Sequence, residues 1–276
     1  MTLHRGRGSL CFGNDMQPLI LRFWGFVDDQ LAQLGSMILL LCDILKTTFS
    51  HRPRWRVTID QTFKIGWQSQ AVVLITGAFT GMVFAVQTGL QFHKVKMDTA
   101  VGAVVSVAMA RELAPVLTAL MVSGRVGASI AAELGTMRVT EQLDALRAMG
   151  TAPVDYLAVP RFVALMISLP LLTAEAMAFG IYSGYVVATT MLGIDHAYFA
   201  SNMYKFTSAK DVASGLIKSV FFAVFIALVS CYKGFNADEG AEGVGRATTQ
   251  AVVVSSLTVL IANFFIAVLF NMIIPP

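Results

Sequence analysis

Five long apolar runs restrict what this sequence can fold into. They lie near residues 65–92, 99–130, 157–193, 212–235 and 247–274, and each exceeds the roughly 20 residues that cross a hydrocarbon core as a helix. Hydrophobic residues make up 56% of the chain and charged residues only 13%, which is too few to cover a water-soluble domain. The sequence therefore predicts an all-α polytopic membrane protein with five transmembrane helices.

The N-terminal part of the chain is predicted to hold a helix that lies on the membrane. Apolar residues recur at helical spacing over residues 31–45, a stretch of about 15 residues that is short for a span. We therefore expect a poorly ordered extension at 1–20, an amphipathic membrane-surface helix at 21–52 and a five-span domain at 53–276. The alternative is a sixth span that runs on toward Thr48. Polar residues interrupt the N-terminal segment, so a cleaved signal peptide is not expected.

The distribution of basic residues predicts the orientation of the chain. Most of the 20 Lys and Arg residues lie in segments on one side of the predicted spans. The connections on the other side carry only Lys94, Lys96, Lys205 and Lys210. The positive-inside rule then places the N-terminus in the cytoplasm and the C-terminus outside.

Charged residues inside the apolar runs are the strongest functional signal. Arg111 and Glu112 lie between the apolar stretches 99–110 and 113–124, so a helix carries them at membrane depth, where ionisable groups are costly and usually functional. Adjacent helical residues point about 100° apart, so these two are not expected to pair with each other. Lys218 is a candidate partner. The alternative is a set of internal salt bridges that fasten the helices together.

Small residues four positions apart predict places where helices pack closely. Gly77 and Gly81 form one such pair, and Ser123 and Gly127 form another. This spacing lets the backbones of transmembrane helices approach each other. The functional hypothesis is a seam between two copies of the chain, and the alternative is packing within one chain.

A short helix is predicted between the second and third spans, at 140–150. Thr140 is expected to cap its N-terminus, and Gly150 to end it, with Pro153 just beyond. A helix of this length cannot span a membrane, so we predict a cytoplasmic helix that docks onto a partner. The alternative is an ordinary surface helix.

Motifs for catalysis and nucleotide binding are absent from the sequence. There is no GxSxG, no HExxH and no GxxxxGK[ST] phosphate loop. The three cysteines have neither metal-site nor disulfide spacing. We therefore expect no enzyme activity, no metal and no cofactor in this chain, and a partner must hydrolyse any ATP that is used.

Four segments carry a resemblance to a known family. They are RELAPVLTALMVSGRVGASIAAELGTMRVTEQLDALRAMG at 111–150, PRFVALMISLPLL at 160–172, GLIKSVFFA at 215–223 and GVGRATTQAVVVSSL at 243–257. Together they resemble the MlaE family, the permease subunits of ABC-type phospholipid transporters that work with MCE-domain proteins. The resemblance extends from about residue 31 to the end of the chain.

The resemblance implies a permease homodimer in the bacterial inner membrane. Two ABC ATPase subunits would bind beneath it and hold the ATP and Mg, in some systems with a STAS-domain regulator, and periplasmic MCE-domain lipid carriers would bind outside. The implied function is movement of phospholipid between the inner membrane and the carrier, which maintains outer-membrane lipid asymmetry; no nucleic acid is expected. The alternatives are an ion-coupled secondary transporter with Glu112 as its proton site and a noncatalytic membrane scaffold.

The resemblance also implies roles for individual residues. Positions that line or border the family's lipid cavity fall at Arg111, Glu112, Lys218 and Arg246, although Arg246 is equally expected to extend its side chain to the membrane surface. Asn263 stands where the family often has an acidic residue, so a charge partner for Lys218 or Arg111 is expected to be missing or replaced. The helix at 140–150 resembles the coupling helix that enters the ATPase groove. Coupling contacts are expected at Glu133, Arg138, Glu141, Gln142, Asp144 and Arg147.

Overall fold

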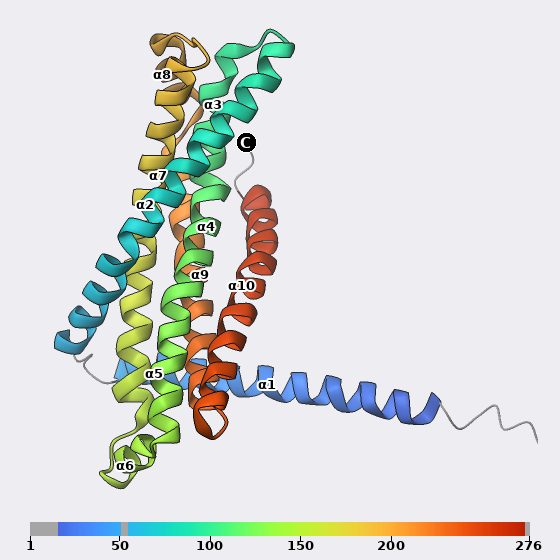
Figure 1. Cartoon of the computed structure of the whole chain (residues 1–276), viewed down its shortest axis with the longest axis vertical. Helices are drawn as coiled ribbons and strands as arrows, with labels where there is room; N and C mark the ends of the chain where they lie inside the picture. Colours follow the sequence, from blue (N-terminus) through green and yellow to red (C-terminus); the bar gives the residue numbers. More distant parts are fainter. Residues whose placement is uncertain (1–15, 51–54, 274–276) are drawn as a thin grey trace, which may run out of the picture. The chain divides into compact units, whose positions relative to one another are not determined.

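The computed structural model describes residues 16–50 and 55–273, and in these ranges the chain forms helices and no β-strand. The α-helices are α1 (Met16–Ser50), α2 (Trp55–Lys94), α3 (Val101–Ala108), α4 (Ala114–Val122), α5 (Ala128–Val139), α6 (Gln142–Ala148), α7 (Val159–Thr190), α8 (His196–Phe206), α9 (Ala209–Phe235) and α10 (Gly240–Ile273) (Figure 1). Shorter helical segments are a 3-10 turn at Asp98–Ala100 and π-helical segments at Met109–Leu113, Ser123–Gly127 and Val154–Ala158.

Five segments match the predicted spans. They are Trp55–Lys94, Val101–Val139, Val154–Thr190, Ala209–Phe235 and Gly240–Met272, and each is long and apolar enough to cross a membrane. The prediction of an all-α polytopic membrane protein is therefore confirmed. Leu31–Thr48 in α1 satisfies the same criterion, so length and composition fit both roles predicted for it, a membrane-surface helix and a sixth span.

Helix α1 is longer than the sequence predicts. It begins at Met16, whereas the membrane-surface helix is predicted to begin at residue 21. Residues 1–15 of the predicted extension lie outside the described residues. The chain up to Cys42 forms a unit of its own, and Asp43–Pro276 forms the second unit, which holds the five spans.

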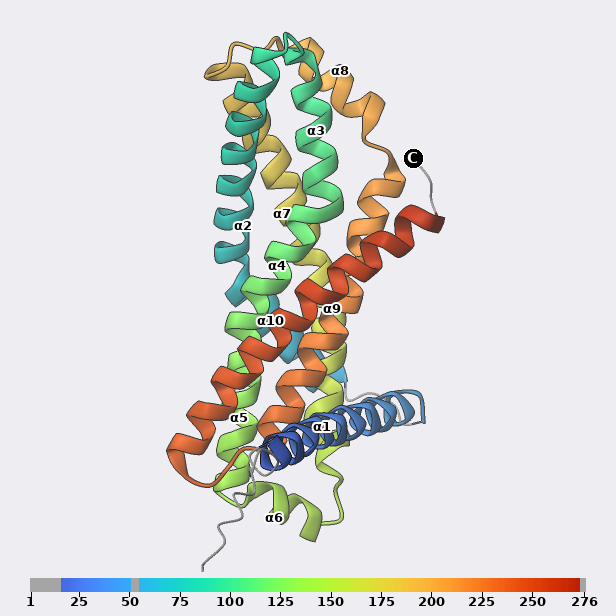
Figure 2. The same ribbon diagram turned by 90° about the vertical axis from the view of Figure 1, so that its right-hand side faces the viewer.

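The second unit is a bundle of long helices. Helix α2 packs along α7, and α9 packs against α5, α7 and α10. Figures 1 and 2 show α8 at one end of this bundle and α6 at the other, and we call these the α8 end and the α6 end. The connections from α5 to α7 and from α9 to α10 both lie at the α6 end.

Small residues allow the closest helix contacts, and these contacts lie within one chain. A Cβ added at Gly77 would lie 3.2 Å from the Cα of Ala176, and one added at Gly81 would lie 2.6 Å from the carbonyl carbon of Gly180. A Cβ at Gly127 would meet the Oγ of Ser230 at 2.9 Å.

Ser123 completes the set of four small residues. Its hydroxyl lies 2.5 Å from the hydroxyl of Ser255 in α10. Packing within one chain, the alternative to a dimer seam, therefore accounts for all four residues, Gly77, Gly81, Ser123 and Gly127.

The second span is not a continuous α-helix. Two π-helical segments, Met109–Leu113 and Ser123–Gly127, separate α3, α4 and α5 from one another. Such segments are rare and are frequently found at functional sites. The first contains Arg111 and Glu112, and the second contains Arg125, so both interruptions coincide with charged residues in the span.

Helix α6 confirms the predicted helix but corrects how it begins. Thr140 does not cap it, because the Thr140 hydroxyl donates to the carbonyl of Thr136 in the preceding turn at 2.8 Å. Glu141 occupies the N-cap instead, with a left-handed φ of 59°. The helix therefore begins at Gln142 and is only seven residues long.

The end of α6 follows the prediction. Gly150 has a φ of 73°, a conformation that glycine adopts without strain. The N–H of Gly150 donates to the carbonyl of Arg147 at 2.9 Å, and the N–H of Thr151 donates to the carbonyl of Leu146 at 3.0 Å. These two bonds form a Schellman motif, which satisfies the last carbonyls of the helix.

Replacing Gly81 should test the packing of α2 on α7. We expect Gly81→Ala to destabilise the protein by about 1–3 kcal/mol, because the added methyl group meets the backbone of Gly180 and the two helices must separate. Thermal unfolding of the purified protein in detergent measures this. Gly66→Ala is the matched control, since a Cβ there meets no atom within 4 Å. Equal stability of the two variants would contradict the prediction.

Candidate functional site

Two charged residues and an asparagine, each from a different span, meet inside the bundle. The Nζ of Lys218 in α9 lies 2.7 Å from Oε1 of Glu112. Asn263 in α10 donates from Nδ2 to the other oxygen of Glu112 at 3.2 Å. Lys218 and Asn263 each lie about ten residues, or roughly 15 Å, from the end of their helix, so the contacts occur at membrane depth.

The backbone of the first π segment helps to hold Lys218. Its Nζ also donates to the carbonyl of Arg111 at 3.0 Å. In an α-helix this carbonyl would accept from the N–H four residues later, but that residue is Pro115, which has none. The lysine therefore supplies a donor where the α-helical N–H is missing.

A glycine brings α9 close enough for this contact. Gly215 lies three residues before Lys218, on a neighbouring turn of the same helix. A Cβ at Gly215 would meet the carbonyl oxygen of Ala110 and would lie 3.1 Å from the Cγ of Pro115. The close approach of the two backbones places Lys218, whose side chain is only 2% exposed, against the π segment.

Arg111 has its own partners. Its Nε lies 3.6 Å from Oδ1 of Asp211, and its Nη2 donates to Oδ1 of Asn271 at 2.9 Å. The second oxygen of Asp211 accepts from the N–H of Ser208 and so caps α9. Arg111 is 29% exposed, and its ion pair with Asp211 is long.

These six residues form what we call the polar cluster. They are Arg111, Glu112, Asp211, Lys218, Asn263 and Asn271. The expected missing charge partner is not needed, because Glu112 pairs with Lys218 and Asp211 pairs with Arg111. Asn263 contributes an amide donor, and its Oδ1 is buried with no hydrogen-bond partner.

Sequence reasoning missed Asp211 and Asn271. Asp211 lies seven residues before Lys218, and Asn271 lies eight residues after Asn263. Residues seven or eight apart share a face of a helix. The helix face that contains Lys218 therefore also contains Asp211, and the face that contains Asn263 also contains Asn271.

An apolar cleft leads to the polar cluster. Its volume is about 490 Å³. One wall is formed by four small or branched residues of α3, namely Ala103, Val104, Val107 and Ala108. The rest of the lining consists of Phe206, Arg111, Glu112 and Asn271. We call it the α3 cleft. It combines an apolar wall with one charged end.

The structure does not bring Arg246 to the polar cluster. Arg246 lies in the first turns of α10, where its Nη1 is 3.9 Å from Asp238 and its Nη2 is 3.7 Å from Glu242. All three side chains are more than half exposed. The residue therefore belongs to the α6 end of the bundle, away from the α3 cleft.

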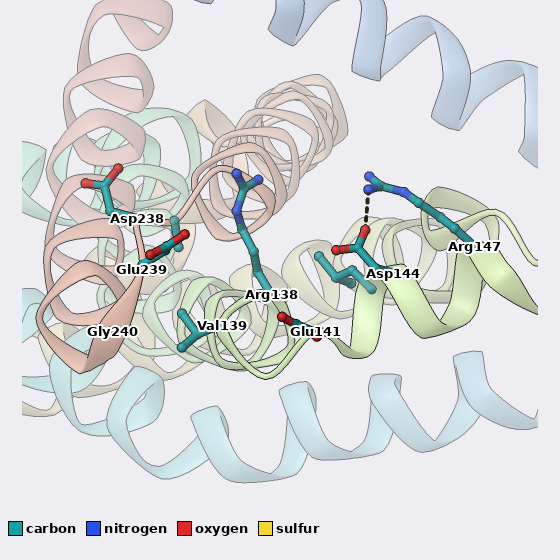
Figure 3. Close-up of a pocket in the computed structure, with 10 residues that line it drawn as sticks. Arg138, Val139, Glu141, Asp144, Arg147, Asp238, Glu239 and Gly240 are labelled. Atoms are coloured by element: carbon teal, nitrogen blue, oxygen red, sulfur yellow. Dashed lines mark hydrogen bonds and ion pairs between the residues drawn. The ribbon is translucent and has the colours of Figure 1, made fainter.

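A second, larger pocket lies at the α6 end, and we call it the α6 pocket. It measures about 700 Å³ and lies between α6, the end of α5 and the loop from α9 to α10 (Figure 3). Charged residues dominate its lining, namely Arg138, Glu141, Asp144, Arg147, Asp238 and Glu239. Arg138 donates to the carbonyl of Phe235, and Arg147 donates to Asp144 at 2.8 Å.

The predicted coupling residues do not all line this pocket. Gln142 is exposed on α6 but is not part of the lining. Glu133 lies earlier in α5 than Arg138, and its Oε2 accepts from Nη2 of the buried Arg161 at 2.7 Å. Glu133 is therefore engaged in a structural ion pair. In the described part of the chain, no three His, Cys, Asp or Glu residues are grouped so that they could hold a metal ion.

Removing one side of the buried ion pair should be costly. We expect Lys218→Met to destabilise the protein by about 2–3 kcal/mol, because it leaves Glu112 at membrane depth without its cation; partial exposure of Glu112 limits the loss. The double variant Lys218→Met with Glu112→Gln should regain part of the lost stability. Thermal unfolding measures both. Arg147→Met is the control, because its exposed pair with Asp144 contributes about 0–1 kcal/mol. If Lys218→Met is no less stable than this control, the buried pair does not stabilise the bundle.

Comparison with known proteins identifies the family of the chain. The family model described as Permease MlaE matches residues 58–269. A probable ABC transporter permease protein of Synechocystis sp. is 45% identical over 212 residues, which are 77% of this chain and 81% of that protein. Another, from Rickettsia conorii, is 43% identical over 212 residues, 77% of this chain and 82% of its own length.

A plant protein is also similar. It is the protein TRIGALACTOSYLDIACYLGLYCEROL 1, chloroplastic, of Arabidopsis thaliana, which is 38% identical over 216 residues, 78% of this chain and 62% of its own length. The family match covers more than half of the chain and includes three of the five spans completely and most of the other two. The chain therefore belongs to the MlaE permease family.

Proposed function

We propose that this permease moves phospholipid between the bacterial inner membrane and a periplasmic MCE-domain carrier, and so maintains outer-membrane lipid asymmetry. The observation that carries the proposal is the α3 cleft, an apolar groove that ends at the polar cluster. A phospholipid has the same two-part chemistry, with apolar acyl chains and a charged head group. The cleft can therefore receive both parts of one molecule.

Arg111 is the residue best suited to meet the phosphate group. Guanidinium groups bind phosphate oxygens through two parallel hydrogen bonds. Arg111 lines the cleft, is partly exposed and holds Asp211 only at 3.6 Å. Lys218 is buried and fixed by Glu112 and a backbone carbonyl, so it positions the π segment. Asn263 and Glu112 complete that support.

The names of two kinds of relative support the proposal. The Arabidopsis relative is named after trigalactosyldiacylglycerol, a glycolipid, which favours a lipid as the transported molecule. The bacterial relatives are named as ABC transporter permeases, which favours an ATPase as the source of energy. In this proposal the partner ATPase binds the ATP and Mg, and a STAS-domain regulator belongs to the complex in some systems.

The α6 pocket is the proposed docking site for the ATPase. Leu143 is buried and anchors α6 to the bundle, while Glu141, Gln142 and Asp144 are exposed. A helix fixed on one face and charged on the other can transmit movement of a bound partner to α5, which is continuous with the span that carries Arg111. In this proposal the α6 end faces the cytoplasm, in agreement with the positive-inside rule.

Transport requires that ATP binding changes the affinity of the cleft for lipid. A ligand shifts a conformational equilibrium only by its difference in affinity for the two states. We propose a homodimer in which the second copy closes the open side of the α3 cleft. Both oxygens of Glu112 already accept hydrogen bonds, from Lys218 and Asn263, so the contacts favour a structural carboxylate over the proton site of an ion-coupled transporter.

Neutralising Arg111 should impair lipid binding without abolishing ATP hydrolysis. We expect Arg111→Gln in the assembled complex to reduce copurified phospholipid and its transfer to acceptor vesicles about tenfold or more, because a hydrogen bond to a charged group contributes about 1.5–3 kcal/mol. Lipid analysis by mass spectrometry and a vesicle transfer assay measure this. Lys210→Gln, which removes a neighbouring cation outside the cleft, is the matched control. Wild-type lipid content and transfer in Arg111→Gln would refute the lipid path.

Reversing a charge on α6 should weaken ATPase binding. We expect Asp144→Arg to reduce copurification of the ATPase, and permease-dependent ATP hydrolysis, about tenfold or more, because losing one side of an interfacial charge pair costs about 2–5 kcal/mol. The fold should be unaffected, since Asp144 and its partner Arg147 are exposed. Lys94→Glu at the α8 end is the control. If both variants bind the ATPase equally well, α6 is not the docking element.

A further inference from the structure

We propose that Lys64 and Arg125 form a binding site for the phosphate group of an anionic membrane lipid, separate from the α3 cleft. The site lies between α2 and the second π segment, in a pocket of about 170 Å³. A water molecule occupies roughly 30 Å³ of the liquid, so the pocket has room for a group of several heavy atoms. Its polar lining consists of Gln61, Lys64, Gln68, Arg125, Ser129 and Glu133.

Arg125 is the first observation that points to an anion. Its guanidinium donates from Nη1 to the hydroxyl of Ser69 at 2.9 Å and from Nη2 to Oε1 of Gln68 at 3.2 Å. Both partners are neutral. Among the described residues, no carboxylate lies within ion-pair distance of Arg125. The two bonds hold the guanidinium at the pocket and leave its charge without an ion-pair partner.

Lys64 adds a second uncompensated cation. It is exposed on α2, one turn before Gln68, and forms no ion pair within the described ranges. The one carboxylate in the lining, Glu133, is held at 2.7 Å by Arg161, which is buried. The negative charge of Glu133 is thus matched by Arg161, and the charges of Lys64 and Arg125 remain to attract an anion.

Aromatic residues on α2 indicate that the pocket lies at the level of lipid head groups. Phe63 and Trp67 are stacked, with ring centroids 6.1 Å apart, and their side chains are 66% and 68% exposed. Exposed Trp residues of membrane proteins gather at the membrane–water interface. These two rings flank Lys64 in sequence and mark one interface on α2.

The distribution of charged residues along α2 also places the pocket at the level of the lipid head groups. Charged residues occur in its first part, at Arg56, Asp60 and Lys64, and none occurs from residue 65 to residue 92. The pocket therefore lies where the polar part of the helix meets the apolar part. A phosphate held there has water on one side and acyl chains on the other, as in a lipid of the leaflet nearest the α6 end.

Lipid titration of the purified full chain in detergent tests the site. Native mass spectrometry measures the affinity for phosphatidylglycerol, which is anionic, and for phosphatidylcholine, which is zwitterionic. We expect phosphatidylglycerol to bind more tightly, and Lys64→Gln to weaken it about fivefold, which corresponds to about 1 kcal/mol for one basic residue at a membrane surface. Arg125→Gln should weaken it at least as much.

Controls separate this site from general charge effects and from the transport path. Lys94→Gln removes an exposed cation at the opposite end of α2 and should leave the affinity unchanged. Inorganic phosphate, added as a competitor, should not displace the lipid; displacement would identify free phosphate as the ligand. The exposed Lys64 can be replaced without disturbing packing, so Lys64→Gln tests the site even if Arg125→Gln unfolds. Unchanged affinity in Lys64→Gln, or an equal loss in Lys94→Gln, would overturn the proposal. Neither result depends on transport or on Arg111.

Discussion

The contact on which the bundle most depends is the one that Lys218 makes with Glu112 and with the carbonyl of Arg111. A lysine and a glutamate at membrane depth are tolerable only if each meets the other, and the carbonyl exposed by Pro115 gives the lysine a further acceptor. Gly215 permits the required approach of α9. The contact joins the second span, Val101–Val139, to the fourth span, Ala209–Phe235. It also holds Glu112 in place at the charged end of the α3 cleft.

Much of the fold follows from hydrophobicity alone. Long apolar runs without strand signals leave helices as the way to satisfy backbone hydrogen bonds in lipid, so the five spans could be predicted from the sequence. The boundaries of α6 could not, because Thr140 has the chemistry of an N-cap but bonds back to Thr136. A local preference for capping was overridden by continuation of α5 through Val139.

The candidate site was predictable in its centre and not at its edges. Arg111, Glu112 and Lys218 attract notice because ionisable residues are rare in apolar runs, whereas Asp211 lies at the first turn of a helix, where an acidic residue has an ordinary capping role. Arg246 lies apart from this cluster, where its side chain is near Asp238 and Glu242 at the α6 end. The small residues Gly77 and Gly81 could not reveal their partner, because close packing looks the same in sequence whether the neighbour is α7 or a second chain.

The two π segments alter the helical register between the two ends of the second span. A turn with hydrogen bonds to the fifth residue holds one residue more than an α-helical turn, so Val101–Val139 contains two residues beyond a regular α-helical register. Each extra residue turns everything after it by about 100° and shifts it along the axis by about 1.5 Å. The side chain of Arg111 contacts α9 and α10, whereas that of Arg125 contacts α2. The two π segments therefore help to set which neighbouring helix each charged part of the second span meets.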